Sequence, residues 1–152
     1  MASRTYCSCS GEERKAMNAI LDTSCLVSLF LKDTHHDKAL RILENIVHGH
    51  SKAFIAALSL VELCGVVRRN TSEATAREVQ QAMNGLIEKD LLTVVPFTAS
   101  DAHDASSIAI ATGLKGADAV TVQAAKKSES QLFTFDEEIK QKGKGQTAFF
   151  EQ

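Results

Sequence analysis

A chain of 152 residues has room for one domain with a core of ordinary size, and a second core would be difficult to build from it. Its residues are 44% hydrophobic and 24% charged, as is typical of soluble globular proteins, and its formal net charge is −2. That charge excludes a protein that binds nucleic acid through an overall basic surface. A local basic rim around an acidic cluster would not show in the sum.

The first sixteen residues are polar and precede the first apolar run. They lack the apolar core of a signal peptide, and no apolar run in the chain reaches the ~18 residues that span a bilayer. The four cysteines form no CxxC pair and no Cys/His set at zinc spacing, so neither a disulfide framework nor a zinc site is expected. We therefore expect a cytoplasmic protein without membrane association. Residues 1–16 are a polar tail and a candidate for disorder, and the folded domain is expected to span residues 17–152.

The first half of the chain alternates short apolar runs with segments of helical periodicity. Strands are expected at residues 18–22 and 53–57, and helices at residues 25–31, 35–47 and 60–67. Thr23 or Ser24 is expected to cap the first helix and Ser59 the third, because hydroxyl side chains accept hydrogen bonds from the free amides of a helix start. Gly49 is expected to end the second helix.

The second half continues the alternation. Helices are expected from Thr71 or Ser72 to about Lys89 and at residues 100–112, 116–127 and 137–142, with strands at residues 91–96 and 131–135. Gly113 is expected to end the helix before it, and residues 147–150 to add an edge strand. Helical segments between apolar strands predict parallel pairing with crossover connections. The expected fold class is therefore α/β, a three-layer α/β/α sandwich with a central, mostly parallel sheet.

Two acidic residues follow apolar strands that lie far apart in the sequence. Asp22 ends the first strand segment, and Asp136 directly follows the segment at residues 131–135. In an open parallel sheet, ligands gather at the carboxyl ends of the strands. Both carboxylates are therefore expected at that edge of the sheet.

Two further acids have both a functional and an ordinary interpretation. Glu62 lies in an otherwise apolar helical segment, where an acid is rarely buried unless it is paired or bound to a metal. Asp118 lies near the start of the helix at residues 116–127. The ordinary interpretation is the same for both, because an acid near a helix N-terminus is favoured by the helix dipole. For Asp118 taken alone, that interpretation is the stronger one.

Four carboxylates that converge at one edge of a sheet would repel one another. Two carboxylates about 4 Å apart repel by about 4 kcal/mol at an effective dielectric of about 20, so such a cluster favours uptake of protons or a divalent cation. Oxygen ligands without Cys or His suit Mg²⁺ or Mn²⁺. Such an ion activates water and stabilises the charge that develops on a phosphodiester.

The segments around these four acids resemble the successive acidic motifs of PIN domains. The segments are Ile20-Leu-Asp-Thr-Ser24, Leu58-Ser-Leu-Val-Glu-Leu63, Gly116-Ala-Asp-Ala119 and Leu132-Phe-Thr-Phe-Asp136. They come in the order of the family, and the resemblance covers the chain from about Asn18 to its C-terminus. Each motif is short, but an ordered set of four on a β-α alternation is specific.

The resemblance implies an α/β/α sandwich and an endonuclease that cleaves RNA with Mg²⁺ or Mn²⁺. The catalytic residues and metal ligands it implies are Asp22, Glu62, Asp118 and Asp136. The supporting hydroxyls would be Ser24 and Thr134, and either Glu137 or Glu138 is near enough in sequence to add a fifth acid. Many small members of this family resemble VapC toxins, which form homodimers and are silenced by an antitoxin protein, whereas others mature ribosomal RNA. The sequence does not separate these roles.

Basic residues near the acidic motifs are candidates for contacts with RNA. They are Arg68, Arg69, Lys115, Lys126 and Lys127. These side chains would contact phosphates around the acidic groove. The alternative has equal weight: they are solvated residues near helix ends, where basic side chains suit the helix dipole.

Other functional interpretations have less support. A receiver or phosphatase domain would carry a second acid beside the first, and the residues after Asp22 are Thr23 and Ser24. His35 and His36 could suggest metal binding, but adjacent residues on a helix do not share a face. The main rival is a PIN scaffold that binds RNA or a protein partner without cutting, and the presence of all four acids argues against it.

Overall fold

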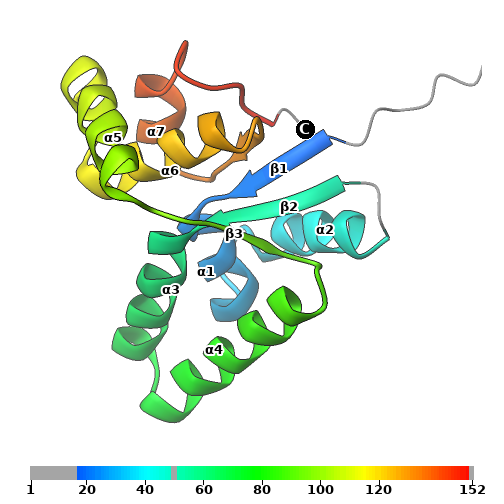
Figure 1. Ribbon diagram of the computed structural model, residues 1–152. Helices are drawn as coiled ribbons and strands as arrows, with labels where there is room; N and C mark the ends of the chain where they lie inside the picture. The colour runs from blue at the N-terminus through cyan, green and yellow to red at the C-terminus, as the bar shows by residue number, and fades with distance from the viewer. Residues whose placement is uncertain (1–16, 49–50, 151–152) are drawn as a thin grey trace, which may run out of the picture.

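The computed structural model describes residues 17–48 and 51–150, which form a three-layer α/β/α sandwich (Figure 1). Its central sheet has four strands in the order β3-β2-β1-β4, and every neighbouring pair is parallel. The strands are β1 (Met17–Leu21), β2 (Ser51–Ala56), β3 (Thr93–Val95) and β4 (Gln131–Phe133). The predicted fold class is confirmed, and the predicted tail at residues 1–16 lies outside the described residues.

Seven helices in the described part of the chain cover the two faces of this sheet. One face carries α1 (Thr23–Leu31), α2 (His36–Val47), α3 (Ala57–Asn70) and α4 (Glu73–Glu88), and the other carries α5 (Ala99–Thr112), α6 (Gly116–Lys127) and α7 (Glu137–Lys142). Figure 1 shows the first group below the sheet and the second group above it. None of the described helices combines the length and the apolar character that crossing a membrane requires.

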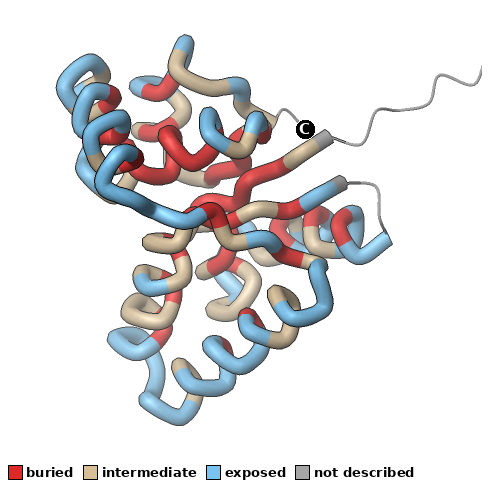
Figure 2. The backbone as a smooth tube through the Cα atoms, viewed as in Figure 1, coloured by how far each residue is buried: buried red, intermediate tan, exposed pale blue. Residues whose placement is uncertain are grey.

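The alternation of side chains along each strand builds one core on each face. Ile20 packs with apolar residues of α5, α6 and α7, whereas its neighbour Leu21 packs with those of α1 to α4. In β4, Leu132 and Phe133 divide in the same way. Figure 2 shows the buried residues concentrated in the strands and on the helix sides that face them. Burial on both faces explains why the strands are continuous apolar runs in the sequence.

Helix α6 is buried along most of its length, with every residue from Ala119 to Ala125 buried. It contacts three strands, β1, β2 and β4, as well as α5 on its outer side. This packing holds both ends of the helix at defined places. Asp118 lies in its first turn and Lys127 in its last.

Two helix starts differ from the sequence prediction. Asp22, not Thr23 or Ser24, is the N-cap of α1, and its carboxylate accepts a hydrogen bond from the backbone amide of Ser24. At α3 the cap position is Ala56, and Ser59 lies inside the helix. The cause is that β2 runs directly into α3, so no hydroxyl residue is left at the junction.

Two other predicted helix ends are confirmed, and one is not described. Ser72 caps α4 with its side chain, and Gly113 ends α5 in the left-handed conformation with a φ of 69°. At the end of α2 the C-cap is His48. The glycine predicted to end that helix, Gly49, lies outside the described residues.

The C-terminal part of the sheet is shorter than predicted. Strand β4 ends at Phe133, so Asp136 stands three residues beyond the strand. Residues 147–150 form no full strand in the described structure, and the predicted edge strand is reduced to an isolated parallel bridge between Phe149 and Leu132. They run beside β4 instead, through two backbone hydrogen bonds with Leu132 of 2.8 and 3.0 Å.

The buried hydroxyl of Ser59 provides a test of this packing. It has no hydrogen-bond partner among the described residues. A buried polar group without a partner lowers stability, and alanine is the better helix former. Ser59→Ala is therefore expected to raise the free energy of unfolding by about 1 kcal/mol, which corresponds to a thermal midpoint about 2–4 °C higher.

Ser28→Ala is the matched control, because Ser28 is also buried but its hydroxyl donates to Asp33 Oδ2 at 2.8 Å. Removing that hydroxyl should lower the midpoint. Thermal unfolding of the two variants beside the parent protein makes the comparison. A lower midpoint for Ser59→Ala would mean that its hydroxyl contributes a favourable interaction.

Candidate functional site

Asp22 is fixed at the carboxyl end of β1 through one of its two carboxylate oxygens. The residue is buried, and its Oδ2 accepts hydrogen bonds from Ser24 Oγ at 2.7 Å and Thr134 Oγ1 at 2.9 Å. The backbone amide of Ser24 donates to the same oxygen at 3.3 Å. No residue in the described ranges donates to Oδ1. The protein therefore sets the direction of this carboxylate and leaves one oxygen for a ligand.

The two hydroxyls that hold Asp22 also join the end of β1 to the end of its neighbour β4, an edge strand of the sheet. Ser24 Oγ and Thr134 Oγ1 lie 3.3 Å apart. Ser24 Oγ accepts from the amide of Phe135 at 3.0 Å, and Thr134 Oγ1 accepts from the amide of Asp136 at 3.0 Å. Each hydroxyl thus accepts a hydrogen bond from a backbone amide and donates one to Asp22, and these two bonds fix the orientation of the hydroxyl group. The segment after β4 is held in place by the same groups that orient Asp22.

Asp136 is the N-cap of α7, and one of its oxygens is fixed in that role. Its Oδ1 accepts from the amides of Glu138 at 2.7 Å and Ile139 at 3.3 Å. The structure shows no hydrogen bond to Oδ2 from the residues that it describes. As at Asp22, one oxygen is bonded to the protein and the other is available.

Glu62 lies in the second turn of α3, where it is half-buried. Its Oε2 accepts a hydrogen bond of 2.8 Å from Thr23 Oγ1, the first residue of α1. This contact ties the start of α1 to α3 beside Asp22. The helix dipole falls off within the first turn, so it does not account for an acid at this position. The sequence did not identify Thr23 as a partner of Glu62, because only the fold brings these two helices together.

The pKa of Asp118 is raised by its surroundings, which include the other three acids. Burial raises the pKa of the Asp118 carboxyl to about 6, and the charges of Asp22 and Asp136 act in the same direction. Glu62 adds to the rise and Lys115 opposes it. Among the described residues, no side chain or amide donates a hydrogen bond to Asp118. The other three acids predicted from the sequence thus all lie near enough to Asp118 for their charges to raise its pKa.

The donor chemistry of this site fits a hard divalent cation, although the side chains are not closed around one. In the described part of the chain, no three Asp, Glu, His or Cys side chains are arranged to hold a metal ion together. The available oxygens and the raised pKa of Asp118 are nevertheless what such an ion would offset. Cys25 does not offer a thiolate, because its Sγ donates to Phe133 O at 3.1 Å and burial raises its pKa.

The two acids considered for a fifth position are engaged elsewhere. Glu137 Oε1 lies 2.6 Å from Lys140 Nζ, and Glu138 Oε1 lies 2.6 Å from Lys142 Nζ. Lys142 holds the pKa of Glu138 below its usual range, and Lys115 adds to this effect from 3.5 Å. Neither acid contributes to the raised pKa of Asp118. We therefore leave them out of the candidate site.

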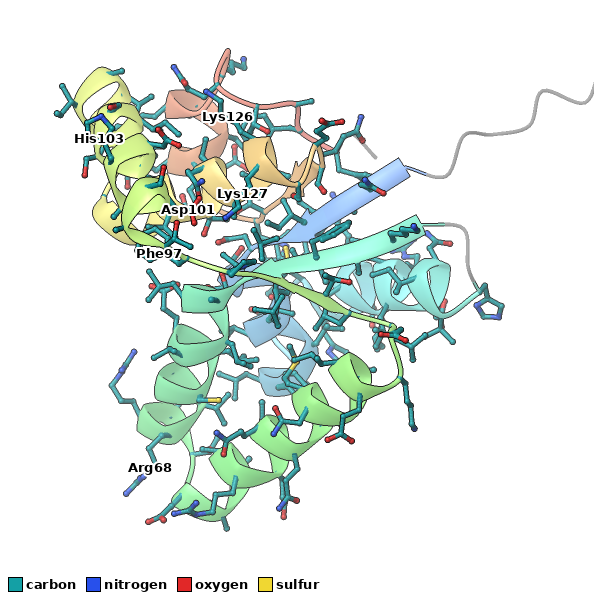
Figure 3. All side chains as sticks on the ribbon, viewed as in Figure 1. Arg68, Phe97, Asp101, His103, Lys126 and Lys127 are labelled. Atoms are coloured by element: carbon teal, nitrogen blue, oxygen red, sulfur yellow. The ribbon has the colours of Figure 1, made fainter. Side chains whose placement is uncertain are left out.

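The predicted basic residues do not form one rim. Lys115 is the N-cap of α6 and is exposed, and its charge reaches Asp118. Lys126 and Lys127 lie at the other end of α6, about 12 Å along the helix axis from Asp118. Figure 3 shows Arg68 at the end of α3 that lies away from the sheet, on the opposite side of the molecule from the two lysines.

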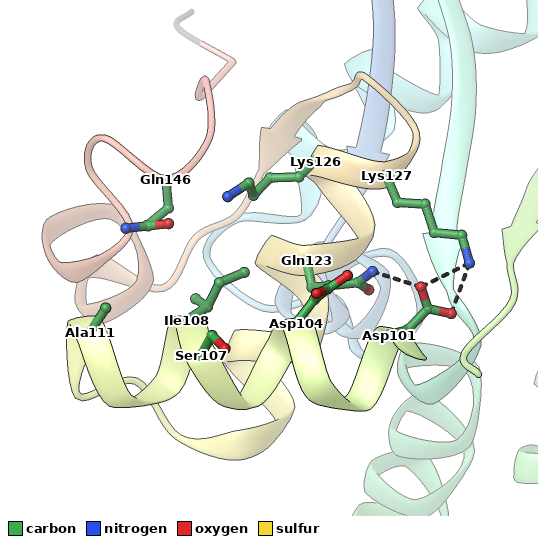
Figure 4. A pocket seen from close by; sticks show the side chains of 9 residues that line it. All are labelled: Asp101, Asp104, Ser107, Ile108, Ala111, Gln123, Lys126, Lys127 and Gln146. Carbon is green, nitrogen blue, oxygen red and sulfur yellow. Dashed lines mark hydrogen bonds and ion pairs between the residues drawn. The ribbon is translucent and has the colours of Figure 1, made fainter. Parts of the chain in front are cut away.

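Lys127 forms an ion pair with the buried carboxylate of Asp101, although its own side chain remains exposed. Its Nζ lies 2.8 and 2.9 Å from the two carboxylate oxygens of Asp101 and donates to Pro96 O at 3.2 Å (Figure 4). Gln123 Nε2 also donates to Asp101 at 2.8 Å, and Thr98 shares a capping box with it. Lys127 holds the pKa of Asp101 well below its usual range. The spacing of Thr98 and Asp101 in the sequence would have indicated the cap, but not the ion pair.

The Asp101 cluster forms one end of a groove of about 700 Å³. Its lining comes from α5, the end of α6 and Gln146, and includes none of the four acids at the sheet edge. Figure 4 shows Lys126 beside this groove and Lys127 turned to Asp101. Because the polar groups of Asp101 are already satisfied, we assign this cluster to the packing of α5 on α6.

The raised pKa of Asp118 predicts how stability depends on pH without metal. The carboxyl is protonated in both folded and unfolded chains below about pH 4 and ionised in both above about pH 6. Between these values the folded state holds the proton more tightly, so this group lowers stability as the pH rises. Asp118→Asn removes that effect. In EDTA the variant should melt at a higher temperature than the parent at pH 7.5, and the difference should shrink towards pH 4.

Asp104→Asn is the control, because Asp104 is exposed on α5 and lies outside the acid cluster. Its difference from the parent should not change in the same way with pH. Thermal melts of both variants from pH 4 to pH 8 make the comparison. If Asp118→Asn melts below the parent at pH 7.5, the Asp118 carboxylate stabilises the fold and is not a repelled ligand.

The sequence of this chain matches a family model, and its fold resembles solved structures. The PIN domain family model matches residues 19–145. The structure resembles the Mycobacterium tuberculosis VapC20, described as a sarcin-ricin loop cleaving toxin, with a TM-score of 0.67 and 18% identity over 82% of this chain and 95% of that one. VapBC2 from Rickettsia felis, bound to a DNA fragment from its promoter, gives a TM-score of 0.66 and 18% identity over 88% of this chain and 98% of that one. A toxin-antitoxin complex from Klebsiella pneumoniae gives a TM-score of 0.56 and 17% identity over 78% and 86%.

No curated protein matches the sequence. The likeness to the solved structures, all of low identity, is one of fold. The family model is more decisive, because it spans most of the chain and includes all four acids of the sheet edge. The chain belongs to the PIN domain family.

Proposed function

We propose that this chain is an endoribonuclease that hydrolyses RNA phosphodiester bonds with the help of Mg²⁺ or Mn²⁺. Membership of the PIN domain family supports a nuclease. The observation that carries the proposal is the acid cluster itself. Four carboxylates from four separate segments act on one another at Asp118, and three of them are bonded to the protein through one oxygen only.

Each residue has a defined part in the proposed reaction. The residues that would hold the ion are Asp22, Glu62, Asp118 and Asp136. When bound, the ion would activate a water molecule and stabilise the charge that develops on the phosphodiester. Ser24 and Thr134 orient Asp22, and Thr23 orients Glu62. The carboxyl of Asp118 holds a proton up to about pH 6, and the exposed ammonium of Lys115 is near enough to attract an RNA phosphate to the cluster.

Asp22→Asn tests the metal mechanism with little change in shape. The amide oxygen can still accept from Ser24 and Thr134, and the amide nitrogen, which cannot bind a cation, takes the place of the available oxygen. Cleavage of a generic single-stranded RNA should fall at least about a hundredfold, and the parent activity should disappear in EDTA. Asp104→Asn, the same change at an exposed position outside the cluster, should leave cleavage intact.

Metal binding gives a second readout that does not depend on activity. An ion at a hundredfold excess over its Kd stabilises the folded state by about 2.7 kcal/mol, which corresponds to roughly 5–11 °C in the thermal midpoint. Mg²⁺ or Mn²⁺ should produce this rise in the parent, and Asp22→Asn should lose most of it. Undiminished cleavage by Asp22→Asn would contradict the mechanism.

One observation favours a second candidate function, a PIN domain that binds RNA or a protein without cutting. No three acids of the described residues stand ready to hold a metal ion. In that case the parent would bind RNA but leave it intact in both Mg²⁺ and Mn²⁺, and neither ion would change its thermal midpoint. The two candidates therefore differ in both measurements.

We also propose that the chain is the toxin of a toxin-antitoxin pair, a cytoplasmic homodimer that an antitoxin protein silences. The support is the likeness in fold to VapC20, described as a toxin, and to the Klebsiella pneumoniae toxin-antitoxin complex.

Expression in a bacterial host tests the proposed toxin role. Induction of the parent chain should arrest growth and Asp22→Asn should not, because arrest by a toxin of this kind requires cleavage. Equal accumulation of the two proteins, measured by immunoblot, is the control. Normal growth with the parent, in cells whose extract shows its nuclease activity, would point to an RNA-processing role instead.

A further inference from the structure

The two arginines at the end of α3 lie on different faces of the helix, although they are neighbours in the sequence. Arg69 follows Glu62 by seven residues, which is close to two full turns, so both lie on one face. Arg68 lies about 100° around the helix from that face. Only Arg69 therefore shares a face with an acid of the proposed site.

Gly65 occupies the turn between Glu62 and Arg69. A Cβ atom built on Gly65 would stand 3.3 Å from Arg69 Nη1, and no other neighbouring atom outside the backbone of this helix would lie within 4 Å of it. The guanidinium group of Arg69 therefore lies over the bare backbone of Gly65. Long side chains on a helix point towards its N-terminus. Because Gly65 has no side chain, the side chain of Arg69 can extend in that direction along the helix. The positive charge is carried back along α3 to about one turn from Glu62.

The guanidinium of Arg69 has no carboxylate partner among residues 17–48 and 51–150, where the ion pairs involve other side chains. The residue is exposed, and so is Arg68. A guanidinium presents its N–H donors in a planar fork that fits phosphate oxygens in pairs. An unpaired guanidinium about one helical turn from Glu62 is therefore suited to an anion that comes with the substrate.

We propose that Arg69, laid over Gly65, binds a backbone phosphate of the RNA strand next to the phosphodiester at the acid cluster. Arg68 has no such role. The inference rests on the proposed ribonuclease function. Of the two arginines on α3 that were candidates for RNA contact, it keeps only Arg69. Arg69 is a positioning residue, because it acts on a phosphate beside the reacting one.

The test is RNA binding by the Asp22→Asn protein, with Ca²⁺ in place of Mg²⁺ so that the RNA survives. The affinity for a labelled single-stranded RNA is measured from 50 to 300 mM salt. Each phosphate contact on a single strand contributes about −0.7 to the slope of log K against log salt. Arg69→Ala should flatten the slope by about 0.7 and weaken binding about fivefold at 0.1 M salt. Arg68→Ala, the matched control, should change neither, and Arg69→Lys should restore most of the slope.

Gly65→Ala separates a role in binding from a role in stability. Alanine is a better helix former than glycine, so the thermal midpoint should rise by about 2–4 °C. Its Cβ would crowd the guanidinium of Arg69, which would have to shift by a few tenths of an ångström, so RNA binding should weaken slightly although the protein is more stable. Weaker binding in a more stable protein supports the proposal, and unchanged binding overturns the part assigned to Gly65.

The outcomes distinguish this inference from the proposed function. In the first outcome, the Asp22→Asn protein binds RNA with a measurable salt slope, and Arg69→Ala and Arg68→Ala change this binding equally. The role of Arg69 is then overturned, and the ribonuclease proposal stands. If the parent protein neither binds nor cleaves RNA, the proposed function falls, and the inference falls with it. Selective loss at Arg69, with Arg68→Ala unchanged and rescue by lysine, supports both.

Discussion

The site depends on the contact between Asp22 and the two hydroxyls of Ser24 and Thr134. Thr134 follows Asp22 by 112 residues, and the hydrogen bond between them joins the end of β1 to the end of the edge strand β4. The same hydroxyls accept the amides of Phe135 and Asp136, so the position of the last acid depends on the first. The contact serves structure and site together: it closes the carboxyl edge of the sheet and aims one oxygen of Asp22 outwards.

Repulsion between the acids at this edge of the sheet opposes the stabilisation that these hydrogen bonds provide. The burial that holds Asp118 in place also raises its pKa, and the neighbouring acids raise it further. Bonds to Thr23, Ser24 and the first amides of α7 offset part of this repulsion at the other acids, but Asp118 receives none from the described residues. The folded chain therefore stores unfavourable electrostatic energy at the place where a cation would relieve it. Such pKa shifts concentrate at functional sites because the same arrangement that strains the fold attracts the ligand.

The sequence predicted what depends on local pattern and missed what depends on distant pairing. The parallel α/β/α sandwich followed from the alternation of apolar strands and helices, and the place of Asp22 followed from its position after β1. Thr23 was read as a helix cap, whereas it binds Glu62, because only the packing of α1 on α3 brings them together. Lys127 is predicted from the sequence to contact RNA phosphates or to be solvated, whereas it pairs with Asp101, for the same reason. A salt bridge between residues 26 apart leaves no periodic signal in the sequence.

Helix α6 shows why the acid cluster and the groove beside Asp101 are separate. Its buried middle, Ala119–Ala125, fixes both ends against the sheet. At one end, Asp118 faces other acids and has no hydrogen-bond donor among the described residues. At the other end, Lys127 and Gln123 satisfy the buried carboxylate of Asp101. Asp101, whose hydrogen-bond partners are all present, anchors the packing of α5 on α6. Asp118, which has no such partners among the described residues, is available to a ligand. The hydrogen-bond partners of a carboxylate therefore locate the site better than the size of the neighbouring cavity does.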